Sequence, residues 1–177
     1  MGIKIKRNYT AAELEKDVLK QLENLHKRTL EMFIRLGAEF VTEARQKTPD
    51  DAYKEALSQI LWSRSAPRAM LGPESPGFND QTGNLRSSIG FMVFYNGEEQ
   101  HANFEGSEAQ GKAQGLQFAR SIGSEFNDGW ALVTVAGMEY AGWVEALGYD
   151  VITGSTLGAE PKFQKHWQRI SKGIKGL

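Results

Sequence analysis

An apolar stripe near the start of the chain constrains the fold more than any other feature of the sequence. Residues recur there at spacings of three and four: Leu14, Val18, Leu22, Leu25, Thr29, Phe33, Leu36 and Phe40. This period places them on one face of a helix. Thr10-Ala-Ala-Glu13 has the capping-box pattern of a helix start. We therefore expect a helix from residue 10 to about residue 47, with a bend near Gly37.

The stripe is wider than a coiled-coil seam. Ile34 and Val41 flank it, and Thr29 interrupts its apolar character. Both features favour packing against a sheet over a coiled coil.

Two later segments predict β-strands. Ser88–Tyr95 is apolar on both alternating faces and ends at Asn96-Gly97. Apolar residues on both faces indicate that both are covered. Trp130–Ala136 predicts a second strand, and Ile3–Ile5 a third, short one.

The remaining segments complete an α+β domain. Thr48-Pro-Asp-Asp51 predicts a second helix start, and residues 63–81 are a loop rich in Pro and Gly. Residues 97–128 are predicted as a long polar loop that holds a short helix near Leu116–Ile122. A C-terminal helix begins near Glu160, with Phe163, Trp167, Ile170 and Ile174 on one face. We expect one domain over residues 1–177, with the long N-terminal helix and the C-terminal helix packed on a small, mainly antiparallel sheet.

Composition limits the classes of function. The chain has 21 basic and 22 acidic residues, so no global basic field attracts nucleic acid or an anionic membrane. It has no cysteine, which excludes disulfides, thiolate catalysis and cysteine-ligated metals. No apolar run approaches the roughly 18 to 20 residues that span a bilayer. The first residues lack the apolar core of a signal peptide, so we expect a protein that is not secreted and has no membrane partner.

Candidate chemical motifs each have a simpler explanation. Gly106-Ser-Glu-Ala-Gln-Gly-Lys-Ala113 approaches a phosphate loop, but Ala113 lacks the hydroxyl that binds magnesium, and no buried strand is predicted before it. His26, His101 and His166 are far apart and show no metal-ligand spacing. The neighbouring acids Asp50-Asp51 and Glu98-Glu99 fit a helix start and a turn. We expect no catalytic residue, no cofactor and no metal ligand.

A basic face is predicted on the C-terminal helix, and it is the candidate assembly surface: Lys162, Lys165, Arg169 and Lys172. Such a face is commonly only solvated, but it also suits DNA phosphate or an acidic partner. Residues 50–128 have an acidic excess. One acidic and one basic surface suit head-to-tail contact between identical copies.

Two motifs carry a family resemblance. Thr82-Gly-Asn-Leu-Arg-Ser-Ser-Ile89 resembles the Thr-Gly-x-Leu-Arg-x-Ser-Ile signature of a minor tail, or head–tail joining (tail completion), protein family of long-tailed bacteriophages and prophages. Tyr140-Ala-Gly-Trp-Val-Glu145 is similar to that family's later Tyr-Ala-x-x-Val-Glu. A long first helix ending in Thr48-Pro49 and a closing helix also match in order. The continuation Ala146-Leu-Gly-Tyr-Asp-Val151 departs from the family's usual Phe-Gly-Thr.

The resemblance implies a structural, non-enzymatic role in tail morphogenesis. Copies of the chain would form a ring, with phage tail or neck proteins as further partners and with any DNA contact confined to the assembled lumen. The protein would lie in the virion, or in the bacterial host cytoplasm during assembly. The alternatives are a hydrolase with a site in the cleft between helices and sheet, and a host-encoded binding module.

The motif residues have expected structural roles. Thr82 and Gly83 form a tight entry, and Leu85 and Ile89 point into the core. On a one-turn helix, Tyr140 and Val144 are expected as apolar anchors. We predict that Arg86 pairs with Glu145, because partly buried opposite charges need a partner. The alternative is that both face water independently.

Overall fold

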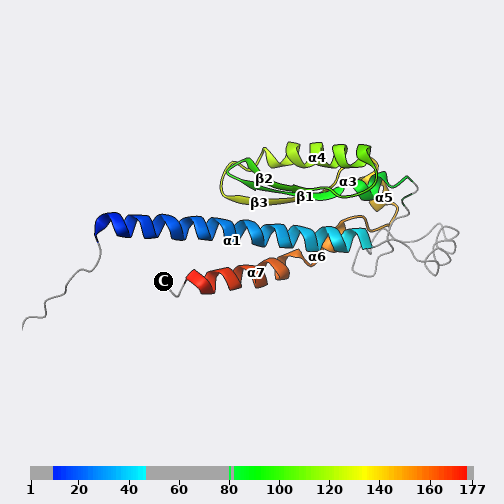
Figure 1. The fold of residues 1–177 in the computed structure, drawn as a ribbon. Coiled ribbons are helices and arrows are strands. Elements are labelled where there is room, and N and C mark those ends of the chain that lie inside the picture. The colour runs from blue at the N-terminus through cyan, green and yellow to red at the C-terminus, as the bar shows by residue number, and fades with distance from the viewer. Residues whose placement is uncertain (1–9, 47–79, 81, 175–177) are drawn as a thin grey trace, which may run out of the picture.

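The described part of the chain is built in layers that follow in the order α4, sheet, α1 and α7 (Figure 1). The computed structural model describes residues 10–46, 80 and 82–174. The main elements are α1 (Ala11–Gln46), β1 (Ile89–Tyr95), β2 (Glu98–Asn103), α4 (Ala109–Gly123), β3 (Trp130–Ala136) and α7 (Ala159–Ile174). Three short helices connect them: α3 (Asn84–Ser88), α5 (Ala141–Ala146) and α6 (Thr153–Leu157). The α+β class predicted from the sequence is confirmed.

The start of α1 has the predicted capping box. The Thr10 amide donates to the Glu13 carboxylate over 2.8 Å, and the Glu13 amide donates to the Thr10 hydroxyl over 3.2 Å. These reciprocal bonds satisfy amides that have no partner within the helix. The bonds from the Thr10 amide and hydroxyl lower the pKa of Glu13, since they favour its charged form.

The sheet has the strand order β2-β1-β3, and both pairings are antiparallel. Asn96 and Gly97 connect β1 to β2 with positive φ angles of 52° and 80°, the backbone that a two-residue hairpin turn requires. On the other side of β1, Ile89 pairs with Ala136 and Tyr95 with Trp130. The central strand is therefore the one whose sequence is apolar on both faces.

Both faces of β1 are covered, as the sequence predicted. Ile89, Phe91 and Val93 join a core with α1, while Met92 and Phe94 join a second core with α4. All five side chains are buried.

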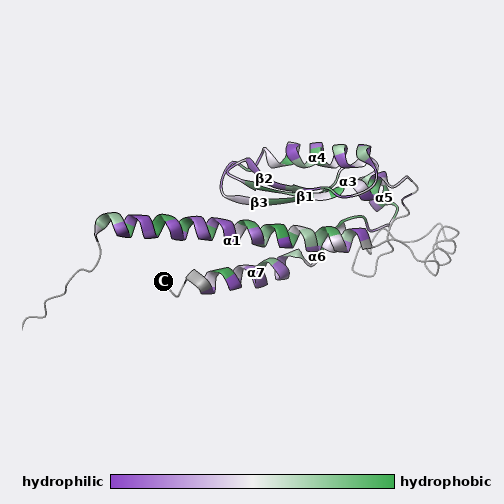
Figure 2. Ribbon diagram, viewed as in Figure 1, coloured by the Kyte–Doolittle hydropathy of each residue, from purple (hydrophilic) through white to green (hydrophobic). Residues whose placement is uncertain are grey.

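The apolar stripe of α1 is divided between core and surface. Thr29, Phe33, Leu36 and Phe40 are buried, whereas Leu14, Val18 and Leu22 are exposed. The N-terminal part of α1 extends beyond the sheet, and green apolar bands alternate with purple polar ones along it (Figure 2). We call residues 11–24 of α1 the overhang. The prediction that the whole stripe packs on the sheet is therefore wrong for its first part.

Gly37 serves close packing in a helix that is continuous from Ala11 to Gln46. A Cβ atom at this position would collide with the ring of Phe91. The glycine thus lets α1 approach the centre of β1.

Residues 97–128 differ from the predicted long loop. They form the edge strand β2 and the helix α4, which has 15 residues. β2 was missed because Glu98-Glu-Gln-His-Ala-Asn103 shows little apolar alternation, and its side chains are exposed or half-exposed. The length of α4 was missed because its glycines lower helix propensity.

The expected strand at Ile3–Ile5, the helix after Thr48 and the loop at 63–81, apart from Asp80, lie outside the described residues. Among the described helices, none is both long and apolar enough to cross a membrane.

Candidate functional site

The two motifs, about fifty residues apart in sequence, meet at one end of the sheet. Ile89 at the start of β1 pairs with Ala136 at the end of β3. Directly beyond this pair, the Gly137 amide donates to the Ser88 carbonyl over 3.2 Å. We call this region, with the flanking α3 and α5, the motif junction.

The first motif enters the junction through a tight turn. The Asp80 carboxylate accepts bonds from the amides of Gly83 (2.9 Å) and Arg86 (2.6 Å). The Thr82 hydroxyl accepts from the Asn84 amide over 3.3 Å. Gly83 is the N-cap residue of α3 and has a φ of 74°, which favours glycine. The predicted tight entry is confirmed.

Two apolar residues of the first motif fix α3 and β1 in the core. Leu85 is 2% exposed and Ile89 is fully buried. Their predicted inward orientation is confirmed, and both belong to the core cluster shared with α1.

The first motif also holds the start of α4. The Ser87 hydroxyl accepts from the Glu108 amide, and the Asn84 side-chain oxygen accepts from the Gly111 amide, both over 3.2 Å. A Cβ on Gly111 would collide with the Asn84 carbonyl, and one on Gly115 would come within 2.5 Å of the Ser88 carbonyl. The glycine-rich segment that approaches a phosphate loop is therefore a packing surface, and the strand before it is an edge strand.

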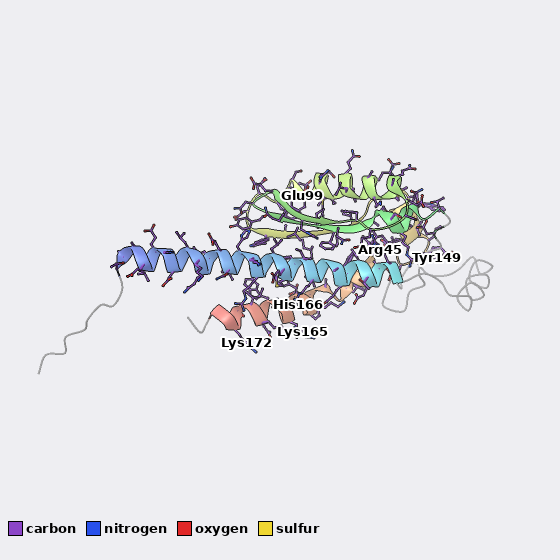
Figure 3. All side chains as sticks on the ribbon, in the orientation of Figure 1. Arg45, Glu99, Tyr149, Lys165, His166 and Lys172 are labelled. Carbon is purple, nitrogen blue, oxygen red and sulfur yellow. The ribbon has the colours of Figure 1, made fainter. Side chains whose placement is uncertain are left out.

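Arg45, near the end of α1, is a junction residue that sequence reasoning missed (Figure 3). Its Nη2 donates to the Ile89 carbonyl over 2.6 Å and to the Glu105 carbonyl. Its Nη1 lies 3.8 Å from the Glu105 carboxylate, and its side chain is 16% exposed. Burial lowers the pKa of Arg45, an effect that Glu105 opposes and Arg86 reinforces. The sequence gives no signal for this role, because a basic residue in the last turn of a helix is common.

The predicted pairing of Arg86 with Glu145 is wrong. Arg86 is exposed, and its Nη2 donates to the Arg45 carbonyl. Glu145 instead accepts from the amides of Ile152 and Thr153, both over 2.9 Å, and from the Thr153 hydroxyl over 3.0 Å. The first amides of a helix have no partner within the helix, and at the start of α6 they donate to the Glu145 carboxylate. Glu145 therefore needs no arginine partner.

The second motif is only partly anchored in the core. Val144 is half-buried against the core cluster, but Tyr140 is 39% exposed and is not the expected anchor. Trp143 and Leu147 also face outward. Further along the chain, the buried Asp150 accepts from the Gly154 amide over 2.9 Å. The acids of this corner thus organise α6.

The basic face of α7 is real but narrower than predicted. Lys162 pairs with Glu43 of α1, and His166 lies 3.4 Å from Glu39, so these two residues tie α7 to α1. Lys165 and Lys172 are exposed (Figure 3), and so is Arg169.

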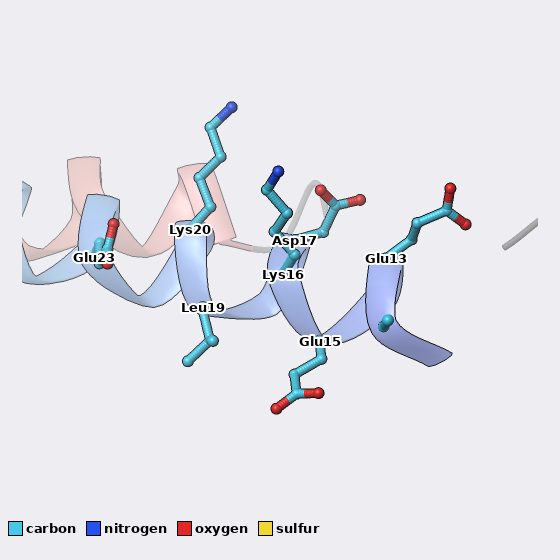
Figure 4. A pocket seen from close by; sticks show the side chains of 8 residues that line it. Glu13, Glu15, Lys16, Asp17, Leu19, Lys20 and Glu23 are labelled. Atoms are coloured by element: carbon cyan, nitrogen blue, oxygen red, sulfur yellow. The ribbon is translucent and has the colours of Figure 1, made fainter. Parts of the chain in front are cut away.

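The hollows described next, in the part of the chain that the structure describes, do not bring together side chains suited to catalysis. One of about 340 Å³ beside β3 and α5 contains two carboxylates, Glu139 and the already bonded Glu145. Another follows the overhang, with Glu13, Lys16, Lys20 and Glu23 projecting from a single helix into open space (Figure 4). Within the described residues, no group of three or more His, Asp or Glu is placed to hold a metal.

Comparisons with protein-family models, with curated proteins and with solved structures found no significant match to this chain.

Proposed function

We propose that this chain is a structural subunit of phage or prophage tail morphogenesis, a head–tail joining or minor tail protein whose copies assemble into a ring. The resemblance of its two motifs motivates the proposal. Their geometry is consistent with it, because Leu85, Ile89, Glu145 and the α4 glycines serve packing and helix starts.

The observation that carries the assembly role is the opposite charge of two opposite faces. Lys162 is paired with Glu43 of α1, so the exposed face of α7 has three cations, Lys165, Arg169 and Lys172, and one acid, Glu160. Residues 98–128 contain six acids and two Lys or Arg, a net charge of −4. The layer order places α7 on one side of the molecule and α4 on the other (Figure 1).

Opposite faces of this kind suit a heterologous contact, in which the α7 face of one copy binds the β2–α4 face of the next. Repetition of such a contact closes into a ring if the rotation permits, and otherwise gives a filament. Charge complementarity sets the register and speeds association. Ring formation in the particle and contacts with tail or neck proteins would follow from the same surfaces.

A charge-reversal experiment tests the contact. Lys165→Glu with Lys172→Glu, or Glu98→Lys with Glu125→Lys, should each abolish higher assembly in light scattering and electron microscopy. Mixing the two variants should restore alternating assembly, since each then offers a complementary face. Glu139→Lys, an exposed acid on neither face, is the control. Assembly that survives both reversals at low salt would contradict the proposed contact.

The biological role has its own test. The phage or prophage that encodes this chain should yield heads and tails that fail to join, or tails that fail to complete, when the gene is deleted. Electron microscopy of the particles is the measurement. Normal, fully tailed particles would refute the tail-assembly role.

A further inference from the structure

The charge pattern changes along the seam between α1 and α7, which pack side by side (Figure 1). In one part of the seam a basic residue of α7 meets an acid of α1: Lys162 pairs with Glu43, and His166 lies 3.4 Å from Glu39. These contacts advance by four residues on α7 and go back by four on α1, so the two helices run antiparallel. The next α1 residue at this spacing is Arg35, which is basic. The pairing of bases with acids therefore ends one turn beyond Glu39.

Three arginines line a hollow at this place. Arg28 and Arg35 come from α1 and Arg169 from α7, and the hollow has a volume of about 310 Å³. Arg28 and Arg35 are seven residues apart, which is close to two full helical turns and places them on one face of α1. Arg169 follows Lys162 by the same interval, so it lies on the face of α7 that meets α1. Helix periodicity and the lining of the hollow thus agree.

The three guanidinium groups have no acidic partner within the described part of the chain. Their side chains are exposed, and none forms an ion pair or a side-chain hydrogen bond with another described residue. Glu31 is the acid among the lining residues, so three cations and one acid leave a net charge of +2. Like charges that share one hollow repel one another, and an anion between them removes that cost.

The base of the hollow is apolar. Met32 is 4% exposed and Ile170 9%, and His166, at the end toward Glu39, has a side chain that is 14% exposed. A hollow with walls of one sign of charge over a low-dielectric base focuses the electric field more than a flat solvated helix face does. The arginines are therefore placed to hold an anion rather than only to face water.

We propose that the hollow binds a di- or triphosphate group. Each guanidinium can donate two parallel N–H bonds to a pair of phosphate oxygens, a geometry that an ammonium group does not offer. Three such groups from two helices match an anion with several charges better than a single carboxylate. The volume of about 310 Å³ lies at the lower end of the range for small-molecule sites, about 300 to 1,000 Å³, and leaves room for more than one phosphate. Free polyphosphate and nucleoside triphosphates both carry this group.

A nucleic-acid strand fits the seam less well than a compact ligand. Its phosphates would continue along the seam beyond the hollow, where they meet the carboxylates of Glu39 and Glu43, whose side chains are 46% and 44% exposed. Repulsion by these acids opposes a bound strand, whereas a di- or triphosphate stays clear of them. The inference rests on neither the tail role nor the head-to-tail contact.

Isothermal titration of the full chain with tripolyphosphate at constant ionic strength tests the site. Arg35→Gln should weaken binding about tenfold or more, because one charge-assisted contact with two bonds is lost. Arg120→Gln is the matched control, since it removes the same charge from an arginine that is 55% exposed and lies outside the hollow. Circular dichroism checks that both variants are folded. No binding by the unaltered chain, or equal weakening by both variants, would overturn the proposal.

Glu31 gives a test in the opposite direction. Glu31→Gln removes the acid from the hollow and should strengthen tripolyphosphate binding about two- to fivefold, the size expected for one exposed charge. Glu15→Gln, at an exposed acid of α1 outside the hollow, should leave the affinity unchanged. Arg35→Lys keeps the charge but loses the two parallel bonds, so its affinity should lie between those of the unaltered chain and Arg35→Gln. An affinity of Glu31→Gln at or below that of Glu15→Gln would contradict the site.

Comparison of ligands identifies the source of the phosphate group. Tighter binding of tripolyphosphate than of ATP, both without Mg²⁺, assigns the group to free polyphosphate. Binding of ATP at least as tight as that of tripolyphosphate assigns it to a nucleotide, and either result supports the site. A short single-stranded DNA that binds more tightly than both, with an affinity that falls steeply as salt is added, would overturn the proposal in favour of contact with a phosphate backbone.

Discussion

At the scale of single residues, Arg45 does the most to connect separate elements. It lies in α1 and binds backbone carbonyls at the start of β1 and after β2. Removal of the guanidinium takes a charged donor from both carbonyls, and the bond to the Ile89 carbonyl is partly buried.

Arg45→Met should therefore lower the free energy of unfolding by about 2 to 3 kcal/mol, the usual range for buried hydrogen bonds to a charged group. Arg120→Met is the control, since Arg120 is 55% exposed and pairs with the surface acid Glu99 over 3.0 Å. That variant should lose at most about 1 kcal/mol. Urea denaturation of both proteins is the measurement, and equal losses would contradict the central role of Arg45.

Glu145 provides a second residue-scale prediction. Glu145→Ala removes the acceptor for the Ile152 and Thr153 amides and should cost about 1 to 2 kcal/mol, as for a lost helix cap. Glu139→Ala, an exposed acid of the same corner, should change stability by less than about 0.5 kcal/mol. Thermal unfolding distinguishes them. A destabilised Glu139→Ala with an unaffected Glu145→Ala would show that the cap is unimportant.

At the scale of elements, the packing of α4 on α3 depends on glycine. Gly115→Ala should destabilise by about 1 to 2 kcal/mol, because overpacking against the Ser88 carbonyl outweighs the gain in helix propensity. Gly142→Ala in α5 should stabilise by about 0.5 to 1 kcal/mol, since open space surrounds that position. Opposite signs in denaturant titrations are expected. A stabilised Gly115→Ala would mean that the backbone contact relaxes easily.

The capping box of α1 makes a pH prediction. The pKa of Glu13 is lowered in the folded chain, so its contribution is present above the ordinary carboxyl pKa and is lost as the pH falls through the lowered value. Fraying of the first turn should therefore appear only on acidification, as a shift of the Thr10 amide resonance. Thr10→Ala should move the pKa of Glu13 back toward its ordinary value, and an unchanged titration would contradict the capping bonds.

The sequence predicted the elements whose buried residues recur with the period of a helix or strand. It missed the elements that lack such an apolar pattern. α1, β1, β3 and α7 carry apolar patterns and were predicted close to their actual bounds. β2 is a polar edge strand that is defined by its ladder with β1, and α4 contains glycines that only close packing explains. Such partners lie far away in sequence, so no local pattern reveals them.

In the motif junction, too, the sequence predicted some features and missed others. The turn at Gly83 and the burial of Leu85 and Ile89 are local properties, and the sequence predicted them. The partners of Arg86 and Glu145 were not predictable from charge alone, because backbone carbonyls and amides satisfy both side chains. Opposite charges within two motifs are weak evidence for an ion pair when helix ends lie nearby.

At the scale of the whole molecule, only part of α1 contributes to the folded core. From Leu25 onward the helix contributes to the core that it shares with β1, β3 and α7. The apolar side chains of the overhang are instead left exposed by the described part of the chain.

This division predicts that the overhang can be changed without unfolding the domain. The triple variant Leu14→Gln, Val18→Gln and Leu19→Gln should keep the unfolding free energy within about 1.5 kcal/mol, since each exposed substitution contributes at most about 0.5 kcal/mol. Phe33→Ala on the same helix should cost about 3 to 5 kcal/mol, because that ring is 8% exposed and packs against Trp130 and Phe163. Denaturation must be measured at concentrations where the chain is monomeric, because a dimer adds concentration-dependent stability. If the triple variant loses as much stability as Phe33→Ala under those conditions, the overhang is part of the folding core.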